Sequence, residues 1–233
     1  MPRIWKTTTP GGVRQLISTL AEWETHAGPK SGTQWVSGRS AKEAAIAWLE
    51  CGDSLPPEVA AVLESHPDFG PVLDWHAEPE AKLRFDQFKG EPRNSDLAVY
   101  VRDRHGPYLI AVEAKADEPF GESFSDALSA AVERYVANRA SKGVARAMQL
   151  ATMLFGPRGK GEPAIGKLRY QLMTAVAGAL CEAERHGYKR TVLLVHEFVT
   201  DKTRDEHHER NARDLAAFLS RLTGGAHVGP WKE

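Results

Sequence analysis

The chain has little cysteine: only Cys51 and Cys181 among 233 residues. Two such isolated cysteines supply neither a disulfide framework nor the spacing of a metal site, which favours a reducing cytoplasm. No apolar run reaches the length that crosses a bilayer, and residues 1–12 lack the apolar centre of a signal peptide. These absences predict a cytoplasmic protein rather than a secreted or membrane protein.

A large net charge is also missing, since the formal charge is −1 at pH 7. A protein that binds duplex DNA through bulk charge would be more basic, so any nucleic-acid surface must be a local patch. The composition, 42% hydrophobic and 26% charged, suits one globular domain. Within it we expect residues 1–39 to form a peripheral helix and loop, 40–199 the core, and 200–233 a terminal helix and tail.

Two apolar runs joined by a turn stand out in the middle of the chain. Residues 97–102 and 108–114 are rich in Val, Ile, Leu and Tyr, and Gly106 marks a bend between them. These runs predict an antiparallel hairpin. A symmetric turn places Arg102 opposite Pro107, and the same register continues to the far end of the hairpin.

In that register Asp96 lies opposite Glu113. Directly opposed side chains share one face of the sheet, and Lys115, two residues beyond Glu113, falls on the same face. Two opposed carboxylates repel each other, whereas a divalent cation between them removes the conflict. Mg²⁺ takes oxygen ligands, and a neighbouring lysine can stabilise negative charge at phosphorus or act on the attacking water. Asp96, Glu113 and Lys115 therefore form a minimal set for metal-assisted hydrolysis of a phosphodiester.

These residues resemble the PD-(D/E)xK nuclease superfamily, whose members share a restriction-endonuclease-like fold. Asp96 matches its metal-binding aspartate and Glu113 to Lys115 its E-x-K element, while Ser95 replaces the proline before the aspartate. The resemblance implies a mixed α/β core over residues 40–199, with a central sheet containing an antiparallel hairpin between helices. It also implies Mg²⁺, with Mn²⁺ as a substitute. The alternative is that Glu113 and Lys115 are ordinary charges at a strand end.

Two further candidates for the catalytic site lie on predicted helices. Nucleases of this kind often carry an acidic residue on a helix before the sheet, and Glu43 in the predicted helix 40–50 occupies that place. Ser40 and Glu43 also match a capping box, in which the glutamate binds the first amide of the helix. Gln171, at the start of a predicted helix 167–186, matches a glutamine that some nuclease-like families place near the metal. Both assignments stay open against a structural role.

Candidate contacts to nucleic acid fall in two places. Arg93 and Asn94 immediately precede the hairpin, where they either contact a phosphate or shape the chain. Residues 134–169 carry eight basic side chains and one acidic, a local charge of +7 in a chain of −1. Such a patch is expected of a phosphate contact, although a solvated surface is the alternative. The candidates in this segment are Arg139, Lys142, Arg146, Arg158 and Lys160.

Three other patterns have structural interpretations. The apolar run 191–199 predicts a strand buried on both faces, and its His196 is expected to be a hydrogen-bonded core residue. The acidic and histidine-rich stretch 205–209 is expected to open a helix, where acids are favoured by the helix dipole. Glu78 and Glu80, just before the hairpin, either reach the metal or stay solvated.

The sequence therefore predicts a Mg²⁺-dependent endodeoxyribonuclease, with DNA as the expected partner. The alternative is a catalytically inactive module of the same fold that binds nucleic acid or a protein. A homodimer is compatible with the resemblance, because nucleases of this size often pair to cut two strands, but no residue identifies an interface.

Overall fold

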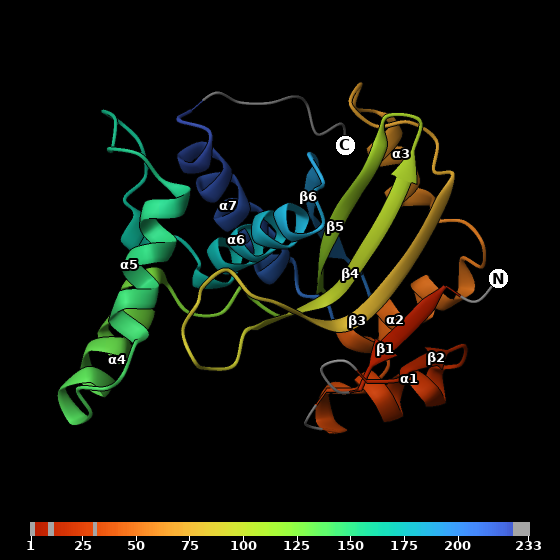
Figure 1. The fold of residues 1–233 in the computed structure, drawn as a ribbon, viewed down its shortest axis with the longest axis horizontal. Helices are drawn as coiled ribbons and strands as arrows, with labels where there is room; N and C mark the ends of the chain where they lie inside the picture. The colour runs from red at the N-terminus through yellow and green to blue at the C-terminus, as the bar shows by residue number, and fades with distance from the viewer. Residues whose placement is uncertain (1–2, 9–11, 30–31, 226–233) are drawn as a thin grey trace.

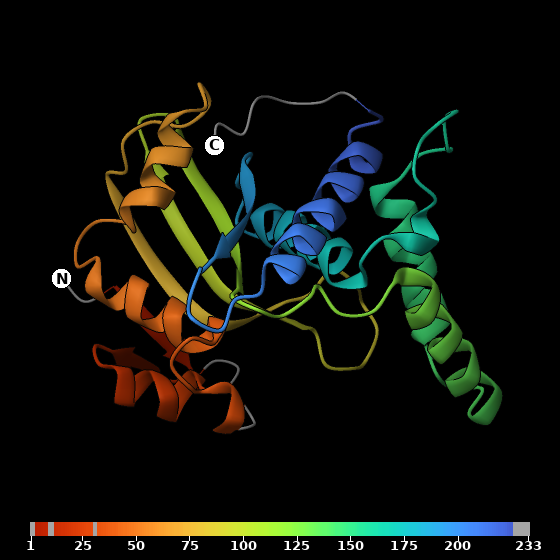
Figure 2. The same cartoon turned by 180° about the vertical axis from the view of Figure 1, so that it is seen from behind.

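We describe residues 3–8, 12–29 and 32–225 in a computed structural model. The chain forms a mixed α/β fold around a six-stranded sheet of order β2-β1-β3-β4-β5-β6, with helices on both faces (Figures 1 and 2). The strands are β1 (Ile4–Thr7), β2 (Arg14–Ile17), β3 (Asp74–Leu83), β4 (Arg93–Asp103), β5 (Gly106–Lys115) and β6 (Thr191–Glu197). The α-helices are α1 (Leu20–Ala27), α2 (Ser40–Glu50), α3 (Pro57–Glu64), α4 (Phe124–Ala137), α5 (Gly143–Leu154), α6 (Tyr170–Arg185) and α7 (Asp205–Leu222), with two 3-10 turns, η1 (Gly32–Gln34) and η2 (Ile165–Lys167).

The N-terminal region is part of the sheet, so the expectation of a peripheral helix and loop is wrong. Strand β2 pairs antiparallel with β1, and β1 pairs in parallel with β3. Ile17 in β2 is buried in the core, and helix α1 begins only after Thr19, which forms a capping box with Glu22. Apolar residues in 13–23 fit a helical spacing, but pairing with β1 determines the backbone of the first half.

Strand β3 is continuous through Pro79, but its backbone is irregular at the next residue. Glu80 has a φ of 48° and is the one non-glycine residue with positive φ in the described chain. Trp75 and Ala77 face the core beneath α2 and α3, whereas Ala81 faces the opposite core, beneath α6. The positive φ therefore reverses which face the strand buries.

The hairpin of β4 and β5 has the predicted register. Arg102 pairs with Pro107, and the ladder continues to Leu97 and Val112 at the other end. Strand β4 starts at Arg93, four residues before the apolar run, because it also pairs with β3. Its central position in the sheet makes the hairpin the most buried part of the fold.

Strand β6 follows the hairpin after three helices and pairs in parallel with β5, as expected for a helical crossover. It is an edge strand, so the expected burial on both faces is only partial, and six of its seven residues are partly exposed. Its apolar side chains complete cores on both sides: Val192 and Leu194 join the α2 side, and Leu193 and Val195 join the α6 side.

Helices α4 and α5 form a hairpin that stands away from the sheet beside α6 (Figure 1). They pack on the rest through a second core that includes Leu150, Leu172 and Phe218. This arrangement leaves space between the helical hairpin and the segment that links β3 to β4. Among the described helices, none is long and apolar enough to cross a membrane.

Candidate active site

Glu113, near the end of β5, is a fully buried carboxylate held by three donors. The Lys115 ammonium lies 2.6 Å from Glu113 Oε1, and the Gln171 amide donates to the same oxygen. The Arg93 guanidinium binds the other oxygen, Oε2. Charged side chains are rarely buried without partners, and these three donors supply such partners to the Glu113 carboxyl group. This arrangement places four predicted site residues in direct contact.

Asp96 lies beside this cluster in the predicted row of the sheet. Leu97 pairs with Val112, so the next positions, Asp96 and Glu113, stand opposite each other where the ladder ends. The backbone N–H of Ala114 donates to Asp96 Oδ2 at 2.7 Å. Burial, and secondly the negative charge of Glu113, raise the pKa of Asp96 to about 7. A bound cation would remove that repulsion and restore the ionised form.

A third carboxylate, Glu80, extends the row to strand β3. Its neighbours Pro79 and Ala81 pair with Leu97 and Ser95, which places Glu80 opposite Asp96. Burial raises the pKa of Glu80, and the charge of Glu113 adds to the effect. Three carboxylates on three adjacent strands therefore occupy one row. The sequence signal for Glu80 was its position just before the hairpin, but only the pairing of β3 shows that it reaches the site.

Asn94 fixes Glu80 in place. Its amide nitrogen donates to Glu80 Oε2 at 3.0 Å, and the Lys6 ammonium donates to the Pro79 and Glu80 carbonyls at 2.8 and 2.7 Å. Arg93, next to Asn94, binds Glu113 as described. In the structure both side chains bind carboxylates of the site, a role that neither interpretation of Arg93 and Asn94 included.

The row of carboxylates borders a pocket of about 430 Å³. Its other walls are the first residues of α2, Arg39 to Ala41, together with Glu118 and Gln171. The amide groups of a helix N-terminus favour anions, so the pocket combines a side that attracts cations with a side that attracts anions. A phosphate bound beside a cation has this charge pattern.

Glu43 is not part of this pocket, which corrects its assignment as a catalytic residue. Its Oε1 accepts from the N–H of Gly38 at 2.7 Å, before the helix. The capping box is wrong in detail as well, because Arg39 is the N-cap, and the Ser40 hydroxyl donates to Glu118. Glu43 thus stabilises the start of α2 through the N–H of Gly38, the residue before the N-cap, instead of through the N–H of the N-cap itself.

The basic segment extends over the end of α4, all of α5 and the loop that follows. Helix α5 has 12 residues and therefore extends about 18 Å, with Lys142 before its start and Arg158 and Lys160 beyond its end. Arg139 lies over the ring of Tyr135 at 4.8 Å. The five candidates therefore spread over the turn before α5, the helix itself and the loop after it, and their contact with phosphate stays a prediction.

Arg146 is a structural residue in this arrangement. Its Nε lies 2.8 Å from Asp86 Oδ2, and its guanidinium stacks 4.9 Å from the centre of the Phe85 ring. The Asp86 side chain is fully buried, so the ion pair attaches the β3–β4 segment to α5. Arg146 consequently offers less free charge to a phosphate than its sequence position indicates.

A two-carboxylate cation site fits these residues. Asp96 and Glu113 are hard oxygen donors, and Mg²⁺ in proteins commonly takes one or two carboxylates and completes its shell with water and phosphate. Among the described residues no group of three or more His, Cys, Asp or Glu side chains is arranged to hold a metal. Two observations support a cation at Asp96 and Glu113. Each carboxylate disfavours a negative charge on the other, which a cation would offset, and the adjoining pocket gives water and phosphate access to both.

Three histidines in the patterns with a structural interpretation, His196, His207 and His208, have carboxylate partners. His196 lies 2.9 Å from Glu58 on α3, as expected for a hydrogen-bonded core residue. The stretch 205–209 opens α7, and there His207 contacts Asp117 and His208 contacts Glu197. Both cysteines are free and half-buried. None of these groups lies in the pocket.

Comparison with known proteins gives a family without an assigned function. The family model described as a domain of unknown function, DUF6946, matches residues 16–231. No curated protein and no solved structure matches the chain. The matched residues include the second half of β2, strands β3 to β6, every described helix and the whole carboxylate row. The chain therefore belongs to the DUF6946 family.

Proposed function

We propose that this protein is a Mg²⁺-dependent nuclease that hydrolyses phosphodiester bonds in DNA. The observation that carries the proposal is the row of Glu80, Asp96 and Glu113 across three strands, with the Lys115 ammonium 2.6 Å from Glu113. The row borders a pocket into which a phosphate can enter. A purely structural sheet gains nothing from like charges on adjacent strands, which destabilise it.

The donor set suits the resemblance to the PD-(D/E)xK superfamily. Asp96 and Glu113 would hold the ion, and Lys115 would stabilise the charge that develops on the phosphoryl oxygens. A bound Mg²⁺ neutralises phosphate charge and lowers the pKa of a coordinated water. Gln171 and Arg93 hold the Glu113 carboxylate in one orientation, a role that outer residues commonly have around metal ligands.

The decisive experiment combines metal and mutation. Purified protein is incubated with plasmid DNA, single-stranded DNA and RNA, in Mg²⁺ or Mn²⁺ and in chelator. We expect metal-dependent cleavage of DNA, lowered at least about 100-fold by Lys115→Met because one electrostatic donor to a transition state contributes about that much. Methionine keeps the buried volume of Lys115 beside Phe120.

Lys189→Met is the matched control, because Lys189 is exposed and lies outside the pocket. It should cleave as the wild type does. Circular dichroism and melting temperature establish that both variants fold. Cleavage that persists in chelator, or that Lys115→Met leaves unchanged, contradicts the proposal.

A second candidate is a non-catalytic module that kept this fold to bind nucleic acid or a protein. The saturation of Glu113 by Arg93, Lys115 and Gln171 favours it, because these donors neutralise the carboxylate without a metal. A thermal-shift titration with Mg²⁺ or Mn²⁺ separates the two. The nuclease is stabilised by the ion and its Asp96→Asn variant responds less, whereas the module responds in neither form.

A further inference from the structure

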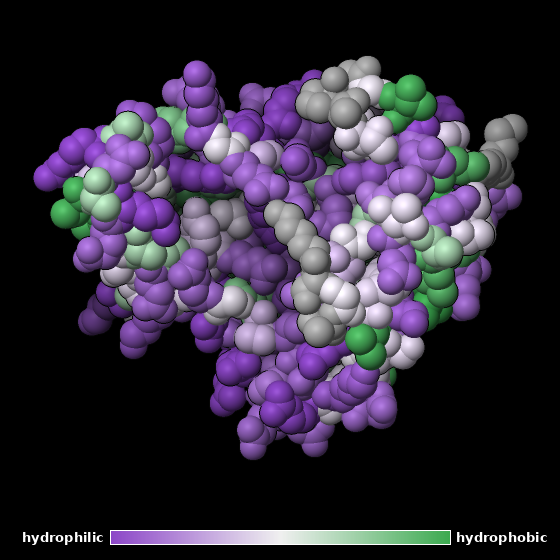
Figure 3. Space-filling model, turned by 90° about the horizontal axis from the view of Figure 1, so that it is seen from below, coloured by the Kyte–Doolittle hydropathy of each residue, from purple (hydrophilic) through white to green (hydrophobic). Residues whose placement is uncertain are grey.

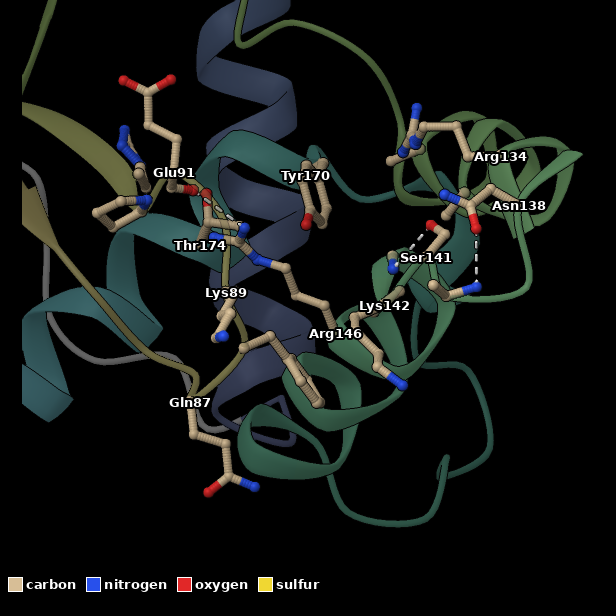
Figure 4. Close-up of a pocket in the computed structure, with 18 of the residues that line it drawn as sticks. Gln87, Lys89, Glu91, Arg134, Asn138, Ser141, Lys142, Arg146, Tyr170 and Thr174 are labelled. Atoms are coloured by element: carbon tan, nitrogen blue, oxygen red, sulfur yellow. Dashed lines mark hydrogen bonds between the residues drawn. The ribbon is translucent and has the colours of Figure 1, made fainter.

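A second, larger cavity of about 1100 Å³ lies next to the candidate active site. Residues 87–93, between β3 and β4, form one wall, the α4–α5 hairpin forms the opposite wall, and the start of α6 lies between them. Figure 3 shows a recess between the lobe of the helical hairpin and the main body, and Figure 4 shows its lining. A volume at the upper end of small-molecule sites suits a ligand larger than one phosphate.

The interior of this cleft is apolar and open because its helices carry small side chains. Ala127, Ala131 and Ala147 present only methyl groups, and Gly143 lies so close to Ala131 that an added Cβ would be 3.0 Å from the alanine Cβ. The Tyr170 ring also lines the cavity, and in Figure 4 it lies between the segment carrying Glu91 and the turn carrying Asn138. An aromatic ring beside methyl groups is a surface on which a nucleobase can stack.

The lining of the cleft carries more cations than carboxylates: five basic side chains against Glu91 and Glu122. Lys89 lies on one wall, and Arg134 and Lys142 lie on the other. No ion pair involves these three side chains within the described part of the chain, unlike Arg146, which is neutralised by Asp86. Unpaired cations on both walls of an apolar cavity suit a ligand with an apolar flat part and a negatively charged backbone.

The cleft and the active site share a wall. Arg93 lines the cleft and also binds the Glu113 carboxylate. Tyr170 and Gln171 are consecutive at the start of α6, and the first lines the cleft while the second donates to Glu113. If a nucleic-acid strand places one phosphate at Glu113 and Lys115, its neighbouring nucleotides therefore meet the cleft.

We propose that this cleft binds unpaired nucleotides of the DNA strand that enters the active site. This inference rests on the proposed nuclease function. Bases in a duplex are stacked and paired, so their faces cannot reach Tyr170, whereas unpaired bases expose both faces. The protein would therefore act on single-stranded or locally opened DNA in preference to a closed duplex.

Binding in chelator tests the cleft without cleavage. The fluorescence anisotropy of a labelled single-stranded oligodeoxynucleotide gives the Kd, with a blunt hairpin duplex and single-stranded RNA as competitors. Tyr170→Leu should weaken binding about tenfold, since one stacked base contributes that order of affinity. Lys142→Gln should weaken it less and lower the salt dependence of log Kd by about 0.7, as expected for one lost phosphate contact to a single strand.

Lys142 is exposed, so its substitution does not endanger folding, and Lys189→Gln is the control that should bind as the wild type does. Ultraviolet crosslinking followed by peptide mapping should place the oligonucleotide on the peptide containing Tyr170. The cleft proposal is overturned if duplex binds as tightly as single strands, or if both cleft variants bind as the wild type does. Failure of the nuclease proposal is distinct: single strands then bind with the expected pattern but are not cleaved with Mg²⁺ or Mn²⁺.

Discussion

Asp103, the last residue of β4, is a buried carboxylate that the fold surrounds with donors. The Arg190 guanidinium donates to it at 2.9 and 2.7 Å, and the backbone N–H groups of Gly70 and His105 donate at 3.0 and 2.8 Å. The bonds from Arg190 are the main reason that the pKa of Asp103 lies well below its usual range. These contacts connect the hairpin turn, the approach to β3 and the start of β6.

Acid should therefore destabilise the protein through Asp103. The carboxyl has a pKa of about 3.9 when unfolded and a lower one when folded, so its contribution is complete above about pH 5 and is lost as the pH falls below about 4. Asp103→Asn should cost about 3 kcal/mol of unfolding free energy at pH 7, because Arg190 loses its partner. Urea unfolding at several pH values measures both effects.

The unfolding free energy of Asp103→Asn should also fall less steeply than that of the wild type as the pH is lowered. Glu64→Gln, at an exposed position at the end of α3, should stay within about 0.5 kcal/mol of the wild type. An Asp103→Asn protein as stable as the wild type at pH 7 would show that the buried pair contributes nothing.

Glu80 combines an unusual backbone conformation with a side chain in the candidate site. Its positive φ is an uncommon conformation for a non-glycine residue, and its carboxylate lies opposite Asp96. We expect Glu80→Gln to weaken Mn²⁺ binding about tenfold, as loss of a residue around a metal typically does. The metal concentration at half-maximal thermal stabilisation measures this.

Glu78→Gln is the matched control, because Glu78 is on the same strand but accepts from Thr7 outside the pocket. It should leave the Mn²⁺ midpoint unchanged. An unchanged midpoint in Glu80→Gln as well would remove the third carboxylate from the proposed site.

At the scale of elements, helix α6 positions the candidate site by its close approach to the sheet. Ala179 and Ala183 pack against Leu109 and Ala111, and the absence of a side chain at Gly178 lets the helix touch β3. A Cβ at Gly178 would lie 3.0 Å from both the Cβ and the carbonyl oxygen of Leu83. This contact determines how near Gln171 comes to Glu113.

Gly178→Ala should destabilise the protein by about 1–3 kcal/mol, although alanine favours helices, because the backbone of β3 cannot move away freely. Urea unfolding measures the loss. Gly156→Ala is the control: no atom lies within 4 Å of the added Cβ, so stability should change by less than about 1 kcal/mol. A stabilised Gly178→Ala variant would mean that α6 is not held against β3 as described.

At the scale of the whole molecule, one sheet lies between two cores. The described tryptophans lie in residues 5–75, on or near the core under α2 and α3, whereas Leu150, Leu172 and Phe218 form the core around α4 to α7. Strand β6 contributes side chains to both cores, so we expect residues 1–233 to unfold as a single domain.

Tryptophan fluorescence and far-ultraviolet circular dichroism should therefore give the same urea midpoint. Fluorescence reports mainly the N-terminal side, and circular dichroism reports all helices. A Leu172→Ala variant, which creates a cavity on the other side and costs about 2–5 kcal/mol, should shift both midpoints together. Separate midpoints would indicate that the α4–α5 hairpin and its core unfold independently.

Local patterns predicted much of this structure. The hairpin and its register followed from apolar runs and a turn, so Asp96, Glu113 and Lys115 were placed correctly without coordinates. Helix α2 also began at the expected residue. Hydrophobic periodicity and turn residues are local properties. They determine such elements when contacts with the rest of the chain favour the same structure.

Contacts between distant segments decided the rest. Pairing with β1 turned residues 14–17 into a strand, and α6 brought Gln171 to Glu113 from 58 positions away in sequence. Helix α5, about 18 Å long, separates Lys142 before its start from Arg158 beyond its end. Linear sequence determined which side chains alternate along each strand, whereas only the tertiary structure decided which strands, helices and cavities those side chains meet, because packing between remote segments depends on the whole chain at once.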